Sequence, residues 1–436
     1  MYRFGGQRIV GGRDLYSIGL FGSRRILLFT YTPFAAICSV PLTLLTPMWL
    51  QTLSLASVPA LLGDAVRRSL EALHTGAASR MWPLAALLIG LCLWLEPVRY
   101  SAQWGQINVL LLAVVIADVL SSPAHKWAGV GVGLVAGIKL TPLIFLIYLG
   151  LIGRLRAALL ASAAFAATVV VSFVVAPQDS QSYWLQRYFA EPARIAPDPA
   201  VSSSLRGLFL RLHYPAGVAT AAAVLLLMAA GLAVATLACR RGQPVLGVAI
   251  VGLTAPAASP FSWSHHWVWF AVLLAHLGYL GYVGGSRRAH WSMWLLWALL
   301  AGWPTGWTGK TPPFGLVTLR PGGTWNAVLP SAYVLVLLIV LASTTVWLWR
   351  DLASRSWIFP RRGFQANSAV RSANNDALTA TGSAVTAAAR IAFGHIRIGG
   401  HRAARTRFLS VRRTPRACII RSISRISAPI AVIRRC

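Results

Sequence analysis

Acidic residues are scarce in this sequence, and charged residues of either sign are few. Asp and Glu together number 10 among 436 residues, and charged residues make up 11% of the chain, whereas hydrophobic residues make up 56%. A soluble domain of this length needs far more charge on its surface. The composition therefore excludes an ordinary soluble globular protein and indicates a polytopic membrane protein.

Cysteine and lysine are also rare. The five cysteines show no CxxC pair and no metal-ligand spacing, so neither a disulfide framework nor a zinc site is expected. Of the 40 basic residues only Lys126, Lys139 and Lys310 are lysines, a bias that indicates a GC-rich genome more than an electrostatic design. No apolar core precedes Ile26, so the N-terminus has no secretory signal pattern.

The sequence does contain a series of apolar runs of roughly 20 residues, the length that crosses a bilayer as a helix. They predict an all-α, polytopic integral membrane protein with about ten transmembrane or re-entrant helices. Prolines interrupt the runs 33–63 and 128–151, and two short or re-entrant helices are expected in each. The expected helices cover residues 33–63, 81–97, 105–121, 128–151, 157–176, 216–239, 244–258, 266–283, 291–303 and 327–349.

Basic residues in the short connections predict the orientation, because Lys and Arg concentrate on the cytoplasmic side. Lys126 and Arg154 can share that side if 128–151 is a helical hairpin with its apex near residues 138–142. The polar motifs described below then all fall on the extracytoplasmic face. The connections counted contain Arg67, Arg68, Arg80, Lys126, Arg154, Arg156, Arg240, Arg241, Arg287, Arg288 and Arg350.

Residues 1–30 fall on the outer face by the same count, although they carry five arginines. Nothing before them in this chain could have carried them across the membrane. We therefore expect that a first transmembrane helix is missing.

The stretch 255–269 contains adjacent histidines between two apolar runs. Its prolines are expected to break the incoming helix, and Ser262 or Ser264 can cap the next one, which places His265 and His266 in its first turn. A helix start bearing imidazoles suits an anion such as phosphate. The alternative is a membrane-interface belt formed by the neighbouring tryptophans Trp263, Trp267 and Trp269.

Two further motifs place polar groups within or beside apolar runs. Gln103 and Gln106 are expected one turn apart at the mouth of the 105–121 helix, where they suit a hydroxyl-rich ligand such as a sugar, or bond neighbouring helices together. Lys139 is the only cation well inside an apolar run. Such a residue is functional by default in a membrane, unless it reaches the interface along its own alkyl chain.

The loop 177–215 adds Asp179 and Arg206. Arg206 could hold a phosphate with two hydrogen bonds, and Asp179 is expected to cap a helix rather than act as an acid. Glu96 is expected to pair with Arg99. If the ligand is a sugar that the protein transfers with inversion, a carboxylate is needed to take the acceptor proton. The outward-facing candidates are Asp14, Glu96, Asp179, Glu191 and Asp198.

Taken together, these motifs resemble glycosyltransferase family 87 of the GT-C class, the bacterial polyprenyl-phosphate-mannose-dependent alpha-(1→2) mannosyltransferases. The resemblance covers roughly residues 2–350 and depends on the order and spacing of its motifs. These are GRDLY at 12–16, FTYTP at 29–33, WGQIN at 104–108, GIKLTP at 137–142, APQDS at 176–180 with Tyr183 and Trp184, SSLRG at 203–207, and SPFSWSHHW at 259–267.

The resemblance implies a multi-pass enzyme of the bacterial plasma membrane with its active face outside. Its donor would be polyprenyl-phosphate-mannose and its acceptor a mannosylated lipid or lipoglycan; membrane lipids would be its other partners, with no nucleic acid, cofactor or metal. By role, the catalytic candidates are His265 and His266, one of which would face the departing phosphate. Lys139 and Arg206 would bind that phosphate. The sugar pocket would be lined by Tyr31, Gln106 and Asn108.

The chain departs from the family at both ends. The resemblance implies a base aspartate just before the Met1-Tyr2 step, and that residue is absent here, through a late start or a damaged gene. We accordingly expect an extracytoplasmic loop remnant at 1–30, a GT-C-like membrane domain at 31–350, and a basic tail at 351–436 that is disordered or frameshifted. The alternatives to a working enzyme are a transporter or flippase, and an inactive remnant lacking its base.

Overall fold

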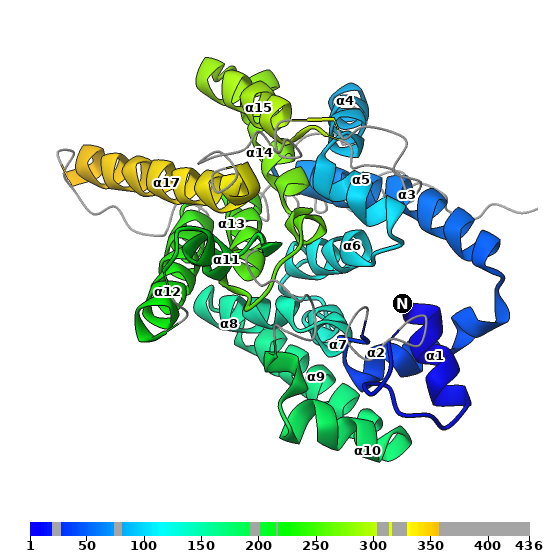
Figure 1. Cartoon of the computed structure of the whole chain (residues 1–436). Helices are drawn as coiled ribbons and strands as arrows, with labels where there is room; N and C mark the ends of the chain where they lie inside the picture. Colours follow the sequence, from blue (N-terminus) through cyan, green and yellow to red (C-terminus); the bar gives the residue numbers. More distant parts are fainter. Residues whose placement is uncertain are drawn as a thin grey trace, which may run out of the picture. The chain divides into compact units, whose positions relative to one another are not determined.

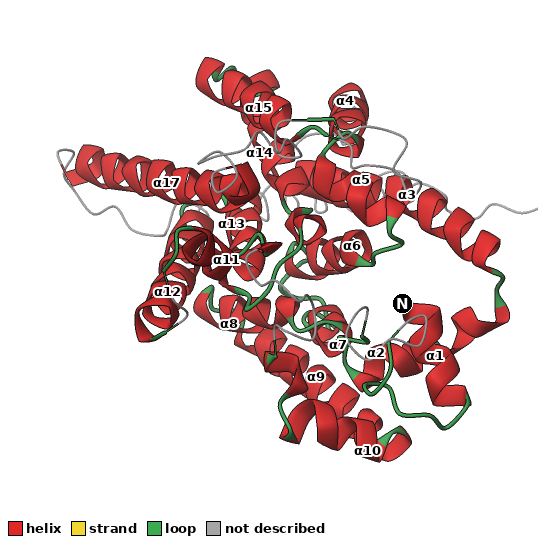
Figure 2. Cartoon of the chain, in the orientation of Figure 1, coloured by secondary structure: helices red, strands yellow, loops and turns green. Residues whose placement is uncertain are grey.

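Helices form all the regular elements in the part of the chain that the structure, a computed structural model, describes (Figure 2). The described residues are 1–19, 28–73, 81–191, 201–214, 217–302, 314–315 and 329–356. They include an isolated β-bridge between Leu95 and Ala301. The expected all-α class is confirmed.

Figure 1 labels the α-helices and colours the chain in sequence order. In the text, η denotes short 3₁₀ helices and, for η5, a π-helical turn. The helices are α1 (Tyr2–Val10), α2 (Pro33–Cys38), η2 (Val40–Leu44), α3 (Pro47–Leu73), α4 (Trp82–Leu93), α5 (Glu96–Gln103), α6 (Asn108–Val119), α7 (Val130–Ile138), η4 (Thr141–Leu143), α8 (Ile144–Leu151), α9 (Leu155–Val175), α10 (Pro177–Ser180), η5 (Gln181–Leu185), η6 (Tyr188–Ala190), α11 (Leu205–Arg211), α12 (Val218–Arg240), α13 (Pro244–Ala258), η9 (Ser264–Trp267), α14 (Phe270–Tyr282), α15 (Arg287–Leu300), η11 (Leu329–Ser331) and α17 (Ala332–Ser356).

Three of these helices are long and apolar enough to cross a membrane: α9, α12 and the Ala332–Arg350 part of α17. The pair α5 and α6 also passes this test as one broken span, bent by 119° between its halves. Shorter apolar helices, α4, α13 and the stretch Thr141–Leu151, accompany them. The described residues therefore form the membrane protein that the composition indicated.

Glycines spaced four residues apart let α7 lie directly on α9. A Cβ atom added at Gly133 would clash with the carbonyl oxygen of Ala161, and one at Gly137 would clash with the side chain of Thr168. Such close approach through small residues is typical of packing between membrane helices. Because the contacts advance in the same direction along both helices, α7 and α9 run parallel. The chain between them must turn back, and it does so at Lys139, where the backbone is extended.

The basic connections on either side of this hairpin meet at one end. Arg156 donates to the carbonyl of Lys126 at 3.2 Å, and Arg154 donates to the carbonyl of Val119 at 2.5 Å. Arg240, the last residue of α12, donates to the carbonyl at the end of α8 at 2.9 Å. The predicted hairpin and the shared side of Lys126 and Arg154 are confirmed.

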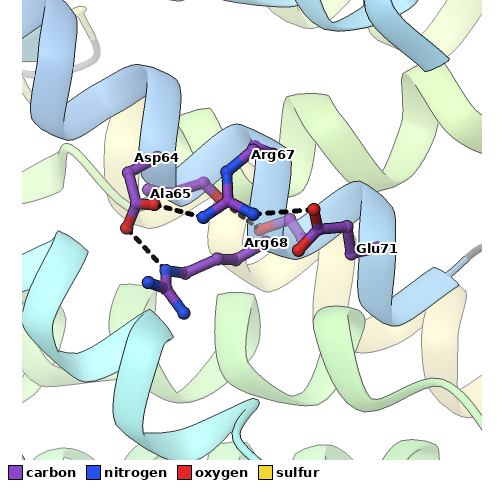
Figure 3. A network of polar contacts seen from close by, with 6 residues as sticks. Asp64, Ala65, Arg67, Arg68 and Glu71 are labelled. Atoms are coloured by element: carbon purple, nitrogen blue, oxygen red, sulfur yellow. Dashed lines mark hydrogen bonds and ion pairs between the residues drawn. The ribbon is translucent and has the colours of Figure 1, made fainter. Parts of the chain in front are cut away.

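The third helix is longer than expected, and Arg67 and Arg68 lie on it instead of in a loop. Asp64 accepts hydrogen bonds from both arginines, at 2.6 and 2.5 Å, and Glu71 accepts one from Arg67 at 2.7 Å (Figure 3). Charge pairs at i,i+3 and i,i+4 favour continued helix, although each exposed pair contributes only about 0.3–0.5 kcal/mol. The apolar pattern ends near residue 63, but the charged pairing carries the helix to Leu73.

The N-terminal segment also differs from the expectation of a polar loop, because α1 folds there and packs on α2 and η2. Gly5 lies against the Phe29 ring and Gly6 against the Ser39 carbonyl, both too close to admit a side chain. The contacts between residues group Met1–Ile358 into one compact unit, which includes this segment. The expectations for Arg80, for Asp198 and for the tail beyond Ser356 lie outside the described residues.

Candidate functional site

Lys139 is held at the break of the α7–α8 hairpin, with its cationic end turned toward the start of α6. Its Nζ donates to Oδ1 of Asn108 at 2.8 Å. Thr32 caps α2 by accepting from the Ala35 N–H, and its hydroxyl donates to the carbonyl of Gly137. The cap therefore ties the segment before α2 to the end of α7, beside Lys139.

That tie places Tyr31 against Lys139. The Lys139 ammonium lies 5.7 Å from the centroid of the Tyr31 ring, within the range of a cation–π contact. The Tyr31 hydroxyl donates to Oε1 of Gln106 at 2.8 Å. Tyr2 of α1 donates to the same oxygen at 3.3 Å, and its ring lies 4.8 Å from that of Tyr31.

Gln106 and Asn108 reach this place because the chain breaks between α5 and α6. Gly105 adopts φ +60, a left-handed conformation that favours glycine, and Gln106 lies in the turn that follows. The expectation that Gln103 and Gln106 share one helix face is therefore wrong, since Gln103 ends α5 and the next helix begins at Asn108.

The histidine pair lies in η9, a four-residue 3₁₀ turn packed on α5. The rings of Tyr100 and His265 stack at 5.6 Å, and the Ser101 hydroxyl donates to the carbonyl of His265 at 3.3 Å. His266 accepts the Trp263 N–H on Nδ1 at 3.3 Å. The histidine itself closes the turn, so the predicted serine cap is wrong.

The α-helix that was expected to begin at the histidines, α14, begins later, at Phe270. Pro256 is accommodated inside α13, which ends at Ala258, and η9 is too short to present the macrodipole of a long helix. Any anion held here would depend on side chains. The interface-belt alternative fails too, because Trp267 and Trp269 are 0% and 7% exposed and pack in the core.

The two histidines face different surroundings. His265 is 6% exposed, and its Nδ1 has no hydrogen-bond partner among the described residues. His266 lines a cavity of about 10 Å³, the size of a single water, together with Asn108 and Thr141. Burial lowers the pKa of both imidazoles well below its usual value, and the Lys139 charge lowers it further. Both rings are therefore neutral near neutral pH.

Arg206 lies on α11, and the residues just before α11 are hydrogen-bonded to Ser262, in the segment before the histidines. Ser203 donates its N–H to the Ser262 carbonyl at 2.6 Å, and Ser262 donates its N–H to the Ser202 hydroxyl at 2.9 Å. Nη1 of Arg206 is buried, with no hydrogen-bond partner in the described part of the chain. An unpaired guanidinium nitrogen of this kind is available to an anionic ligand.

Of the seven predicted site residues, the structure brings six into one set of contacts, and we call these six the Lys139 cluster. Asn108 links Lys139 to His266 through the cavity, and Tyr31 links Lys139 to Gln106. Arg206 stands apart, connected to the histidines through its loop and not by a described contact. The cluster consists of Tyr31, Gln106, Asn108, Lys139, His265 and His266.

The buried carboxylates are held elsewhere. Asp179 accepts the Leu15 N–H at 2.8 Å from within α10, so the expected helix cap is wrong and the residue instead fastens the N-terminal segment. Burial raises the pKa of Asp179, an effect that the Leu15 N–H opposes. Glu96 accepts a hydrogen bond from the Tyr333 hydroxyl. The Arg99 guanidinium lies 4.4 Å from a ring of Trp94.

Two site residues were missed by the sequence reasoning. Tyr2 and Tyr100 are the aromatic neighbours of Gln106 and His265, respectively. A tyrosine beside an apolar run gives no signal of a partner far along the chain.

Among the described residues, no group of three or more His, Cys, Asp or Glu could hold a metal ion. The expectation of a metal-free reaction stays a prediction.

Comparisons with known proteins agree with the family resemblance. The sequence model described as Glycosyltransferase family 87 matches residues 29–260. A protein of Mycobacterium tuberculosis (strain ATCC 25618 / H37Rv), named as a polyprenol-phosphate-mannose-dependent alpha-(1-2)-phosphatidylinositol mannoside mannosyltransferase, is 33% identical over 296 residues, which are 64% of this chain and 69% of the relative. Its namesake in Mycolicibacterium smegmatis (strain ATCC 700084 / mc(2)155) is 31% identical over 301 residues, 63% and 68% of the two chains.

A third relative, from Mycobacterium tuberculosis (strain CDC 1551 / Oshkosh), is named for a phosphatidylinositol pentamannoside acceptor. It is 35% identical over 254 residues, 57% of this chain and 58% of the relative. No solved structure matches the chain significantly. Because the family match covers more than half of the sequence and includes five of the seven predicted site residues, we conclude that the chain belongs to glycosyltransferase family 87.

Proposed function

We propose that this membrane protein is a mannosyltransferase that takes mannose from polyprenyl-phosphate-mannose and adds it to a phosphatidylinositol mannoside at the extracytoplasmic face. The family and the named activities of the relatives support the donor and the acceptor class. One structural observation carries the assignment of the site: Asn108 and a neutral His266 line one cavity, and Lys139, from a third segment, is hydrogen-bonded to that asparagine.

In the transfer, the bond between the mannose C1 and the phosphate oxygen breaks, and a bond from C1 to an acceptor hydroxyl oxygen forms. The departing phosphate gains negative charge. Lys139 supplies a cation to that charge, and Nδ2 of Asn108, buried without a described partner, supplies a further donor. Arg206 joins these donors once the lipid phosphate has entered. Donors fixed before the reaction stabilise the developing charge without reorganising.

The mannosyl group is held on the other side of Lys139. Gln106 accepts hydrogen bonds from two tyrosines, so its amide oxygen is fixed and its amide nitrogen can donate to a sugar hydroxyl. The Tyr31 ring offers an apolar face to the sugar. The acceptor hydroxyl loses its proton in the same step. The family resemblance assigns that proton to an aspartate that is absent from this sequence, so the proton acceptor that the reaction itself supplies is the departing phosphate, whose second pKa is about 6. Asp179 accepts the Leu15 N–H and Glu96 accepts the Tyr333 hydroxyl.

The test is mannosyl transfer in proteoliposomes supplied with labelled polyprenyl-phosphate-mannose and phosphatidylinositol mannosides. We expect transfer by the full chain and a loss of about 10²–10³ in turnover for Lys139→Met, the usual cost of removing one donor to a developing anion. Lys126→Met is the matched control, because Lys126 lies at the opposite end of the hairpin and should leave turnover unchanged.

A transporter or flippase would give a different result in the same vesicles. It would move labelled lipid between the two leaflets without forming a new glycosidic bond. Lipid movement without product, or product formation unaffected by Lys139→Met, would contradict the proposal.

A further inference from the structure

A second cavity, unrelated to the Lys139 cluster, opens between α13, α14, α15 and α17. It is a groove of about 500 Å³, within the range of about 300–1,000 Å³ that holds small ligands. Most of its lining is apolar and includes Leu277, Leu296 and Val340. Figure 1 shows the four helices that form it. The lining suits a hydrocarbon chain.

Two buried polar groups interrupt that apolar lining. His276 is 3% exposed, and its Nδ1 has no hydrogen-bond partner among the described residues. Oε1 of Gln243 is likewise buried without a described partner. Both residues line the groove. Because buried polar atoms are normally satisfied, a ligand in this groove should carry matching polar groups.

A cation stands at one mouth of the groove. Arg288 lines the groove from the first turn of α15, with Gln243 from the start of α13. This is the end of the molecule where Arg240 bonds to the end of α8. The 13 residues of α14 separate it from the histidine turn by about 20 Å. A donor whose phosphate lies at Lys139 therefore cannot place that same phosphate at Arg288.

We propose that this groove is a binding site for an anionic glycerophospholipid with a hydroxyl-bearing headgroup. Its phosphate pairs with Arg288, a headgroup hydroxyl donates to Gln243, and an ester carbonyl accepts from His276. One acyl chain follows the apolar lining toward the far end of the groove. Arg288 and Gln243 lie at the starts of α15 and α13, and His276 lies six residues, or about 9 Å, before the end of α14. The headgroup contacts therefore come before the ester contact and the apolar lining, as headgroup, ester and chain follow one another in such a lipid.

The experiment is native mass spectrometry of the delipidated full chain in detergent, titrated with phosphatidylglycerol or with phosphatidylcholine. The wild type should bind phosphatidylglycerol at least about tenfold more tightly, because its headgroup carries net negative charge and hydroxyls. Arg288→Gln should weaken that binding about tenfold. Arg287→Gln is the matched control, since Arg287 is the exposed neighbour that does not line the groove.

A second variant tests the chain-binding part without removing charge. Ser292 lines the groove at an exposed position, so Ser292→Trp should fold, fill the space and abolish tight binding. Equal weakening by Arg287→Gln and Arg288→Gln would overturn the proposal, because it would mean diffuse charge attraction. Displacement of phosphatidylglycerol by polyprenyl phosphate would also overturn it, because the groove would then belong to the donor chain. If the wild type forms a dimer and Ser292→Trp abolishes it, the groove binds a second copy of the chain and the lipid proposal is overturned.

Discussion

Substitutions at the two adjacent histidines should separate their roles. His266 accepts the Trp263 N–H on Nδ1, so a neutral ring must carry its proton on Nε2. Because His266 lines the cavity beside Asn108, we expect that Nε2–H to be the group that donates to the departing phosphate oxygen. His265 instead stacks on Tyr100 and has no place in the lining of that cavity.

The expected magnitudes differ accordingly. Removing one donor to a developing anion costs about 2.7–4 kcal/mol, or about 10²–10³ in turnover. His265→Phe keeps a ring at this position and perturbs one aromatic contact, worth at most about 0.5–1.5 kcal/mol, so its effect on turnover should not exceed about tenfold. We therefore expect His266→Phe to be at least about tenfold more damaging than His265→Phe.

Amide substitutions at His266 refine the test. His266→Gln can place an amide N–H near the position of Nε2, whereas His266→Asn can replace only the Nδ1 acceptor that closes the turn. The glutamine variant should retain more activity than the asparagine variant. Initial rates with labelled polyprenyl-phosphate-mannose at saturating acceptor, on protein of matched melting temperature, measure both. Equal activity of the two amide variants, or equal losses at the two histidines, would refute the assignment of Nε2.

Three further predictions concern stability and orientation. Gly133→Ala should overpack against α9, destabilise the fold by about 1–3 kcal/mol and so lower the melting temperature. Gly150→Ala, at an unobstructed helix position, should leave the melting temperature unchanged. Burial raises the pKa of Asp179 in the folded state, so its carboxyl favours folding only when protonated. Wild-type stability should therefore gain on acidification from neutral pH toward the unfolded pKa of about 3.9, and Asp179→Asn, which keeps the acceptor for the backbone N–H, should lose that gain in thermal melts. In a variant whose five native cysteines, including the exposed Cys38, are replaced by serine, membrane-impermeant maleimide added to intact cells should label Gln178→Cys and not Lys126→Cys; the reverse pattern would invert the proposed topology.

The sequence predicted those helices whose limits coincide with changes in apolar pattern. The run 244–258 became α13 with the same bounds, and the runs 157–176 and 216–239 became α9 and α12 within two residues. The hairpin break at Lys139 was also foreseen, because a lysine followed by a proline interrupts an otherwise apolar run. In each case the bilayer and the backbone impose a requirement that can be read locally.

Local pattern failed where a tertiary contact decided the conformation. The turn at Gly105 depends on a left-handed backbone that many glycines could adopt, and only the packing of α5 on η9 selects this one. Trp267 and Trp269 have the composition of an interface belt, yet both are buried by Phe145, Phe270 and Tyr333. Burial of an aromatic ring depends on neighbours from distant segments.

The sequence by itself determined the membrane-spanning, all-α class, the family and the residue types of the candidate site, because these follow from apolar length, motif order and side-chain chemistry. Only the tertiary structure decided which of those residues meet. Asn108, Lys139 and His266 come from three breaks between helices, and the direction of each break is set by packing against other helices. It also decided that Asp179 fastens the N-terminal segment, since hydrogen-bond partners far apart in sequence are fixed by the fold.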